Sequence, residues 1–227
     1  ASMFAFHNSH SMATPFGGAV VSIVVMGAIG LCVCLLTGDI VFAGQYKNST
    51  LKNEVSFGLS RTRIYLGKLI AQTLLSIVYL AVMMGFFIGL CAVVLPMEPS
   101  AGFYSAADAM AIVGYFLAAG LPLWIGAQAA ACMCLFLIHG EMAASFLHVG
   151  LIFVAPSIVE VAGLLLEGGI GELLLKVHAY FPNTMLSNVK TVVGDPVYLG
   201  QAWLVGAFWL AACTAIGLYG FHRKEIK

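Results

Sequence analysis

Two ionisable side chains in otherwise apolar sequence are the first candidates for chemistry. His148 lies in residues 142–159, which contain no Asp, Glu, Lys or Arg, and Glu160 ends that stretch. Within a membrane such groups mark ion or substrate pathways. Each also has a structural explanation: a neighbouring helix can satisfy a neutral histidine, and Glu160 can reach the outer headgroups. Both are therefore candidates for a pathway or its gate.

The sequence lacks the residue patterns that would indicate a metal-binding, ATP-binding or catalytic site. Cys32 and Cys34, like Cys132 and Cys134, are two residues apart, so a helix would point each pair about 200° apart, which is wrong for chelating one metal ion. No Gly-x-x-x-x-Gly-Lys-Ser/Thr loop for ATP occurs. No His–Glu metal motif or carboxylate pair lies in an apolar stretch, which argues against an intramembrane enzyme. The sequence thus assigns no catalytic, cofactor-binding or metal-binding residue.

The composition predicts that the two pathway candidates, His148 and Glu160, lie in membrane-spanning helices. Of 227 residues, 9% are charged and 61% hydrophobic, and the mean hydropathy is +1.00, unlike a soluble domain. A net charge of zero argues against nucleic-acid binding. A helix crosses a bilayer with about 20 apolar residues. The sequence predicts an all-α polytopic membrane protein, one transmembrane domain over residues 1–227, with helices at 17–42, 64–95, 106–138, 143–166 and 199–221.

The basic residues predict the orientation. Eight of the ten follow the first or the last predicted helix: Lys47, Lys52, Arg61, Arg63, Lys68, Arg223, Lys224 and Lys227. The positive-inside rule places these segments in the cytoplasm, so the C-terminus is cytoplasmic and the start of the chain extracellular. This odd number of crossings leaves two hypotheses: a five-helix protein with its N-terminus outside, or a six-helix protein whose first helix is missing from this chain.

The loop at residues 44–63 is the segment that says most about function. Leu51, Val55 and Leu59 recur every four residues and predict a short amphipathic helix, which Gly58 can end. Ser60 is the expected N-cap of the next helix. The opposite face of the short helix carries Lys52, Asn53 and Glu54. Two interpretations stay open: a connector at the lipid interface, or a helix that binds a cytoplasmic partner.

The predicted extracellular segment, residues 167–196, is amphipathic but interrupted by glycines. Its apolar run near residues 173–177 predicts a short helix at, or dipping into, the outer interface, and Pro182 starts another turn. The alternative is a plain amphipathic surface loop. Either structure could cover the outer end of a pathway.

The loop also carries a resemblance to a known family. Residues 45–68, with Thr50-Leu51-Lys52-Asn53, Gly58, Ser60-Arg61 and Gly67-Lys68, resemble the signature of ABC-2 type ABC transporter permeases. Within that superfamily the chain is most similar to the small permeases of bacitracin and lantibiotic immunity exporters. The motif covers about 25 residues, and the remainder of the resemblance is topological. It implies that the first helix of this chain corresponds to the second helix of the family.

The resemblance implies an exporter subunit of the bacterial cell membrane that confers resistance to antimicrobial peptides by moving an amphipathic peptide or lipid-like antibiotic. A separate cytoplasmic ABC ATPase would bind ATP and Mg, while this chain would bind no cofactor and be no enzyme itself. A second permease copy, identical or different, would complete the pathway. The residues implied in ATPase coupling are Thr50, Leu51, Lys52, Asn53, Glu54, Val55, Gly58, Arg61 and, in the turn between the third and fourth helices, Glu141.

The alternative function is a secondary transporter or channel subunit that is not driven by ATP. Such proteins are expected to show paired intramembrane charges or helices broken at mid-depth. In this sequence His148 is the only residue that resembles such an intramembrane charge.

Overall fold

The computed structural model describes residues 16–42, 54, 56–96, 105–138, 140–166 and 168–223, and this part of the chain is built from helices and turns. Four helical stretches are long and apolar enough to cross a membrane. Three are α4 (Arg61–Val94), α5 (Ala106–Leu137) and α10 (Pro196–Arg223). The fourth, Met142–Leu165, combines α6 (Glu141–Val149), a π-helical turn η2 (Gly150–Val154) and α7 (Ala155–Leu165). The prediction of long apolar helices in these four places is confirmed.

The expected helix at residues 17–42 is broken instead of continuous. It consists of α1 (Phe16–Met26), a 3₁₀ segment η1 (Gly27–Cys32) and α2 (Val33–Phe42). Gly27 packs so closely on Phe116 that an added Cβ would overlap the ring. The carbonyl of Gly30 accepts a hydrogen bond of 3.2 Å from Nε1 of Trp124. Side chains of α5 thus pack against the break and bond one of its carbonyls, as polar groups in an apolar environment require.

The starts of α4 and α5 are set by serine caps. Oγ of Ser60 accepts a hydrogen bond of 3.4 Å from the backbone N–H of Arg63. This cap confirms the sequence expectation and starts α4 three residues before predicted residue 64. Ser105 caps α5 by accepting from the N–H of Asp108 at 3.1 Å, and its hydroxyl lies 2.7 Å from the Asp108 carboxylate.

The centre of the bundle is α5, which contacts α1, α2, α4, α6, α10 and the short helix α9 (Pro182–Asn188). Its closest neighbour is α10, because Gly206 lies directly on the backbone of Pro122 and leaves no room for a Cβ. Such contacts between small residues let apolar helices pack closely. The end of the bundle that carries Arg61, Arg63, Lys68 and Arg223 is called the basic end below.

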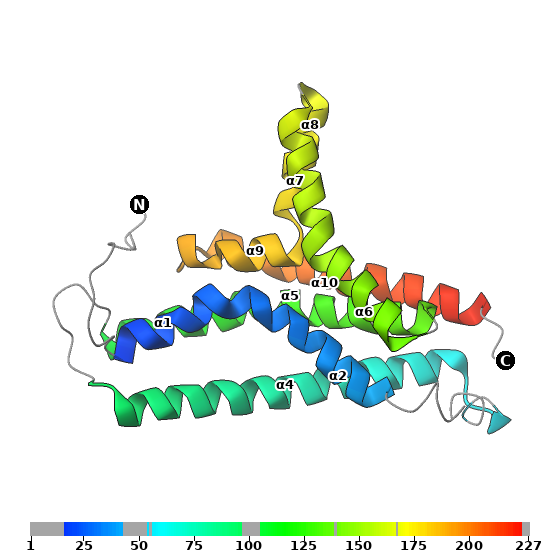
Figure 1. Ribbon diagram of the computed structural model, residues 1–227, viewed down its shortest axis with the longest axis horizontal. Helices are drawn as coiled ribbons and strands as arrows, with labels where there is room; N and C mark the ends of the chain where they lie inside the picture. Colours follow the sequence, from blue (N-terminus) through cyan, green and yellow to red (C-terminus); the bar gives the residue numbers. More distant parts are fainter. Residues whose placement is uncertain are drawn as a thin grey trace.

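Helices α7 and α8 (Gly169–Ala179) form a hairpin that stands away from the bundle (Figure 1). They contact mainly each other, whereas α6 and α9 (Pro182–Asn188) lie on α5. The hairpin returns at the midpoint of α10, where Nε1 of Trp209 donates to the carbonyl of Tyr180 at 3.3 Å. The structure therefore has helices where the sequence predicted a short helix near 173–177 and a turn at Pro182. A plain surface loop in that segment is ruled out.

Candidate coupling and pathway sites

Arg61 ties the first residue of α4 to the last turn of α10. Its Nη1 donates hydrogen bonds to the carbonyls of Phe221 at 2.7 Å and His222 at 2.8 Å. The guanidinium carbon also lies 5.7 Å from the centre of the Phe221 ring. A cation at the C-terminal carbonyls of a helix is stabilised by the helix dipole. Two of the long helices are thus fastened together at the basic end.

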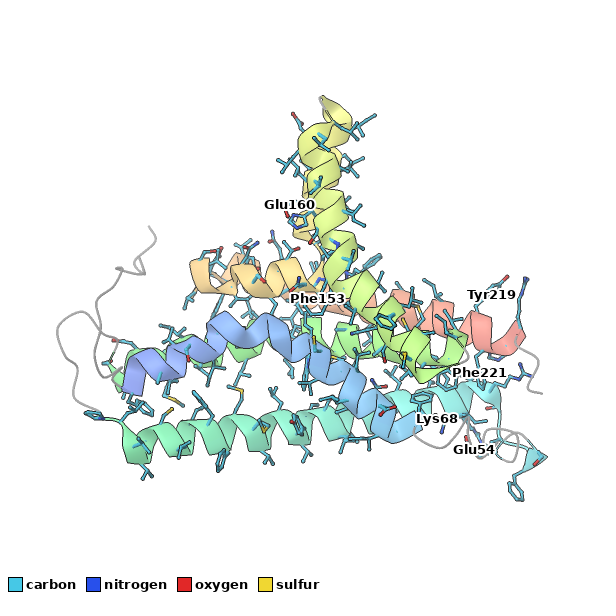
Figure 2. The ribbon with its side chains drawn as sticks, viewed as in Figure 1. Glu54, Lys68, Phe153, Glu160, Tyr219 and Phe221 are labelled. Atoms are coloured by element: carbon cyan, nitrogen blue, oxygen red, sulfur yellow. The ribbon has the colours of Figure 1, made fainter. Side chains whose placement is uncertain are left out.

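A second contact fastens the end of the loop to α4. Nζ of Lys68 lies 3.3 Å from Oε1 of Glu54 (Figure 2). Gly58 has a φ of +82°, and the N–H of Leu59 donates to the carbonyl of Glu54 at 3.3 Å. This pairing around a left-handed glycine is the Schellman motif that ends helices. The predicted helix end at Gly58 is therefore present, and the turn before it is paired to α4.

The predicted coupling residues fall into three groups. Glu54, Gly58 and Arg61 lie together at the basic end. Glu141 begins α6 directly after Gly140, whose φ is +122°, but its side chain lies outside the described part. The other members of the set also lie outside the described residues: Thr50, Leu51, Lys52, Asn53 and Val55. Their predicted role stays a prediction.

His148, the first pathway candidate, points into the bundle. It is fully buried in α6, beside the backbone of Leu31 in η1. Neither ring nitrogen makes a hydrogen bond within the described residues. A buried polar group without a partner costs free energy. The imidazole thus faces the broken helix, with the backbone of Leu31 beside it.

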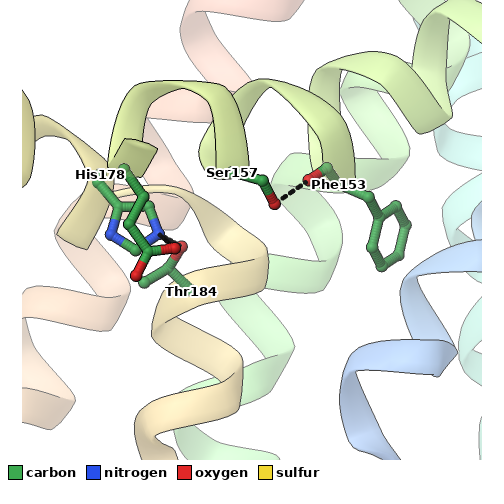
Figure 3. Close-up of polar contacts among 5 residues, drawn as sticks. Phe153, Ser157, His178 and Thr184 are labelled. Atoms are coloured by element: carbon green, nitrogen blue, oxygen red, sulfur yellow. Dashed lines mark hydrogen bonds and ion pairs between the residues drawn. The ribbon is translucent and has the colours of Figure 1, made fainter. Parts of the chain in front are cut away.

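Glu160, the second pathway candidate, lies at the base of the α7–α8 hairpin. Its Oε2 is 3.8 Å from Nε2 of His178 in α8, and that nitrogen is 3.1 Å from Oγ1 of Thr184 in α9 (Figure 3). The Glu160 side chain is half exposed, while His178 is mostly buried. One polar group from each of three helices therefore meets where the hairpin joins the bundle.

Sequence reasoning missed a group of four buried polar side chains, Thr37, Gln72, Ser76 and Gln128, here called the polar clamp. Gln72 Nε2 donates to Gln128 Oε1 at 2.7 Å and to the carbonyl of Cys34 at 3.1 Å. The hydroxyls of Thr37 and Ser76 are 2.9 Å apart, and Nε2 of Gln128 also bonds to Ser76. The clamp joins α2, α4 and α5, and its members are at most 2% exposed.

The signal for the clamp is present in the sequence but weak. Gln72 and Ser76 are four residues apart and hence on one face of α4, in a stretch without charge. A search for ionisable groups passes over neutral amides and hydroxyls. Yet hydrogen bonds between such side chains join helices in apolar surroundings. The partners on α2 and α5 could not be found without the fold.

Comparison with protein-family models, with curated proteins and with solved structures finds no match for this chain. The fold and the sites define it as an all-α protein with four helices that could span a membrane, the architecture of a multi-pass membrane protein.

Proposed function

We propose that this chain is the membrane-spanning permease subunit of an ABC exporter, driven by ATP that a separate cytoplasmic subunit hydrolyses. Its cargo is an amphipathic peptide or a lipid-like antibiotic. The observation that carries the proposal is the attachment of the described end of the loop, residues 54 and 56–63, to two long helices, through Glu54–Lys68 and through the bonds of Arg61 to the end of α10. The resemblance of residues 45–68 to the permease signature supports the same role.

The attachments suggest how force would reach the membrane helices. An ATPase that moves the loop would displace α4 through the turn at Gly58 and the Glu54–Lys68 pair. Arg61 would carry the displacement to α10. Since α4 and α10 both pack on α5, the two helices would move together against the bundle centre.

The proposed topology has five crossings in the bacterial cell membrane, with α1, η1 and α2 as the first. The basic end faces the cytoplasm, in agreement with the positive-inside rule. A second permease copy, identical or different, would form the other wall of the pathway. ATP and Mg belong to the ATPase subunit.

Purification of the complex from native membranes tests the proposal. We expect an ATPase subunit at equal stoichiometry and export in vesicles that requires ATP. A lone homo-oligomer that transports in response to an ion gradient would contradict the proposal.

A secondary transporter is the second candidate, and one observation favours it. The first predicted span is broken at η1, and side chains from other helices bond carbonyls in and just after the break: Trp124 on Gly30 in η1 and Gln72 on Cys34 in α2. Broken helices of this kind form the ion and substrate sites of secondary transporters. Uptake by proteoliposomes without ATP, driven by a proton or sodium gradient and lost in His148→Ala, would support this candidate.

A further inference from the structure

Helix α4 is bordered by a cavity that neither proposed function uses. The cavity has a volume of about 200 Å³ and lies between α4, η1 and α5, with Leu186 of α9 at one side. Its α4 wall, Tyr79 to Met83, and its α5 wall, Phe116 to Trp124, are near the midpoints of the two helices. In Figure 1 the chain arches away from α4, with η1 at the crest. In a bilayer this cavity would lie at the depth of the acyl chains.

The walls of the cavity are almost wholly apolar. Leu, Met, Phe and Gly residues make most of the lining. The indole N–H of Trp124 is already bonded to the Gly30 carbonyl, so it is not free for a ligand. Tyr79 and Met83 are 43% and 50% exposed, which places the mouth on the lipid-facing side of α4. A polar ligand would find few partners here.

The size and position of the cavity select one occupant. An apolar cavity of about 150 Å³ inside a protein takes up benzene, so 200 Å³ admits part of a hydrocarbon chain. In a bilayer core the molecule that meets the mouth is the acyl chain of a phospholipid. A hydrocarbon chain in this space would gain dispersion contacts with the apolar walls.

We propose that the cavity binds one acyl chain of a membrane phospholipid, which enters past Tyr79 and Met83 and ends against Trp124. The bound chain would fill the space under the broken helix and support η1. This site does not depend on the proposed ATP coupling, because it requires neither an ATPase nor a cargo.

Fluorescence of Trp124 tests the site directly. The protein has three tryptophans, and Trp203→Phe with Trp209→Phe leaves only Trp124. The full chain is placed in nanodiscs of phosphatidylcholine, with or without bromine on the acyl chains. Trp124 is 6% exposed, so a bromine must enter the cavity to touch it. Since pockets bury most of a ligand's surface, we expect brominated lipid to quench roughly half or more of the emission.

Gly30→Leu supplies the matched variant. A Cβ at Gly30 meets no heavy atom within 4 Å, and Gly30 lines the cavity, so the leucine would occupy the space of the acyl chain. Quenching should fall by at least about twofold, since a filled pocket leaves no room for the chain. Gly85→Leu is the control, because Gly85 on α4 also has open space but does not line the cavity.

Two results would overturn the proposal. One is equal Trp124 emission in brominated and plain lipid. The other is quenching in Gly30→Leu as strong as in Gly85→Leu. If Gly30→Leu does not fold, Gly30→Ala and Gly85→Ala are compared in its place, and the smaller side chain must still lower the quenching.

Discussion

The basic end and the α7–α8 hairpin are held by very different contacts. At the basic end the rings of Phe42, Tyr65 and Phe221 surround Phe136, at centroid distances of 4.6–5.0 Å. The polar clamp and the Arg61 bonds lie beside them. The hairpin packs mainly on itself, with Glu160 of α7 beside His178 of α8. Its base is joined to the bundle where His178 contacts Thr184 of α9 and where Trp209 of α10 donates to the carbonyl of Tyr180. Regions with few buried contacts open at lower free energy than a packed core.

This difference assigns different mechanical roles to the two regions. The basic end joins four helices through buried rings and hydrogen bonds, so it should move as a rigid body. The hairpin exposes apolar side chains over much of its length, including Leu164, Leu165, Ile170 and Leu173. It can therefore change its angle to the bundle with little loss of contact. Under the proposed function, a rigid end would suit the transmission of force, and a hairpin that changes its angle would suit a gate.

The largest expected loss of stability follows the removal of the Phe136 side chain, the central ring at the basic end. Phe136→Ala should lower the free energy of unfolding by about 3–5 kcal/mol, because a large buried side chain leaves a cavity. Leu173→Ala in the hairpin, where the leucine is 60% exposed, should change it by less than about 0.5 kcal/mol. Denaturant titration in micelles measures both variants. Similar losses would remove the contrast between the two regions.

The stability of the protein should also depend strongly on the close contact between α5 and α10. Gly206→Ala places a Cβ against the backbone of Pro122, and overpacking of this kind costs about 1–3 kcal/mol. Gly200→Ala, in the same helix but in open space, is the control. Thermal unfolding should separate the two variants. A stable Gly206→Ala protein would mean that α10 is free to move away from α5.

Loss of the polar clamp should have an intermediate effect. Gln128→Leu removes the acceptor of Gln72 and a donor to Ser76, and we expect a loss of about 1–2 kcal/mol, since interhelical hydrogen bonds are modest in apolar surroundings. Gln201→Leu, on the exposed face of α10, matches the substitution without the network. Equal stability of these two variants would show that the clamp does not hold α4.

The smallest effect on stability is expected at the hairpin base. Glu160→Gln weakens the contact with His178, and a half-exposed pair of this kind contributes less than about 1 kcal/mol. Because His178 also contacts Thr184 of α9, the pair ties α7 to that helix, and the angle of α7 to the bundle should respond more than the stability. Spin labels at Leu164 and Trp203 should give a broader distance distribution in Glu160→Gln than in the unsubstituted protein. An unchanged distribution would show that the pair does not hold the hairpin.

Several features of this fold could be predicted from the sequence because they depend on local signals. Long charge-free stretches marked four helices, Ser60 marked the start of α4, and Gly58 marked a helix end with its left-handed φ. Each signal lies within a few residues of the feature that it sets. Local propensity and polarity are sufficient for such features.

The features that could not be predicted depend on contacts between distant residues. The break at η1 needs Phe116 against Gly27 and Trp124 on the Gly30 carbonyl, which no pattern within residues 17–42 reveals. The bonds of Arg61 to the end of α10 span 160 residues of sequence. Only the assembled helices show these contacts.

The most direct test of the central claim is the double variant Leu51→Asp/Val55→Asp, reconstituted with the ATPase subunit. The claim is that the loop before Gly58 transmits the action of an ATPase to α4 and α10. Charges on the apolar stripe of the predicted helix should remove its docking surface while the protein stays in the membrane. We expect loss of the ATP hydrolysis that cargo stimulates. Hydrolysis stimulated as strongly as in the unsubstituted complex would contradict the account.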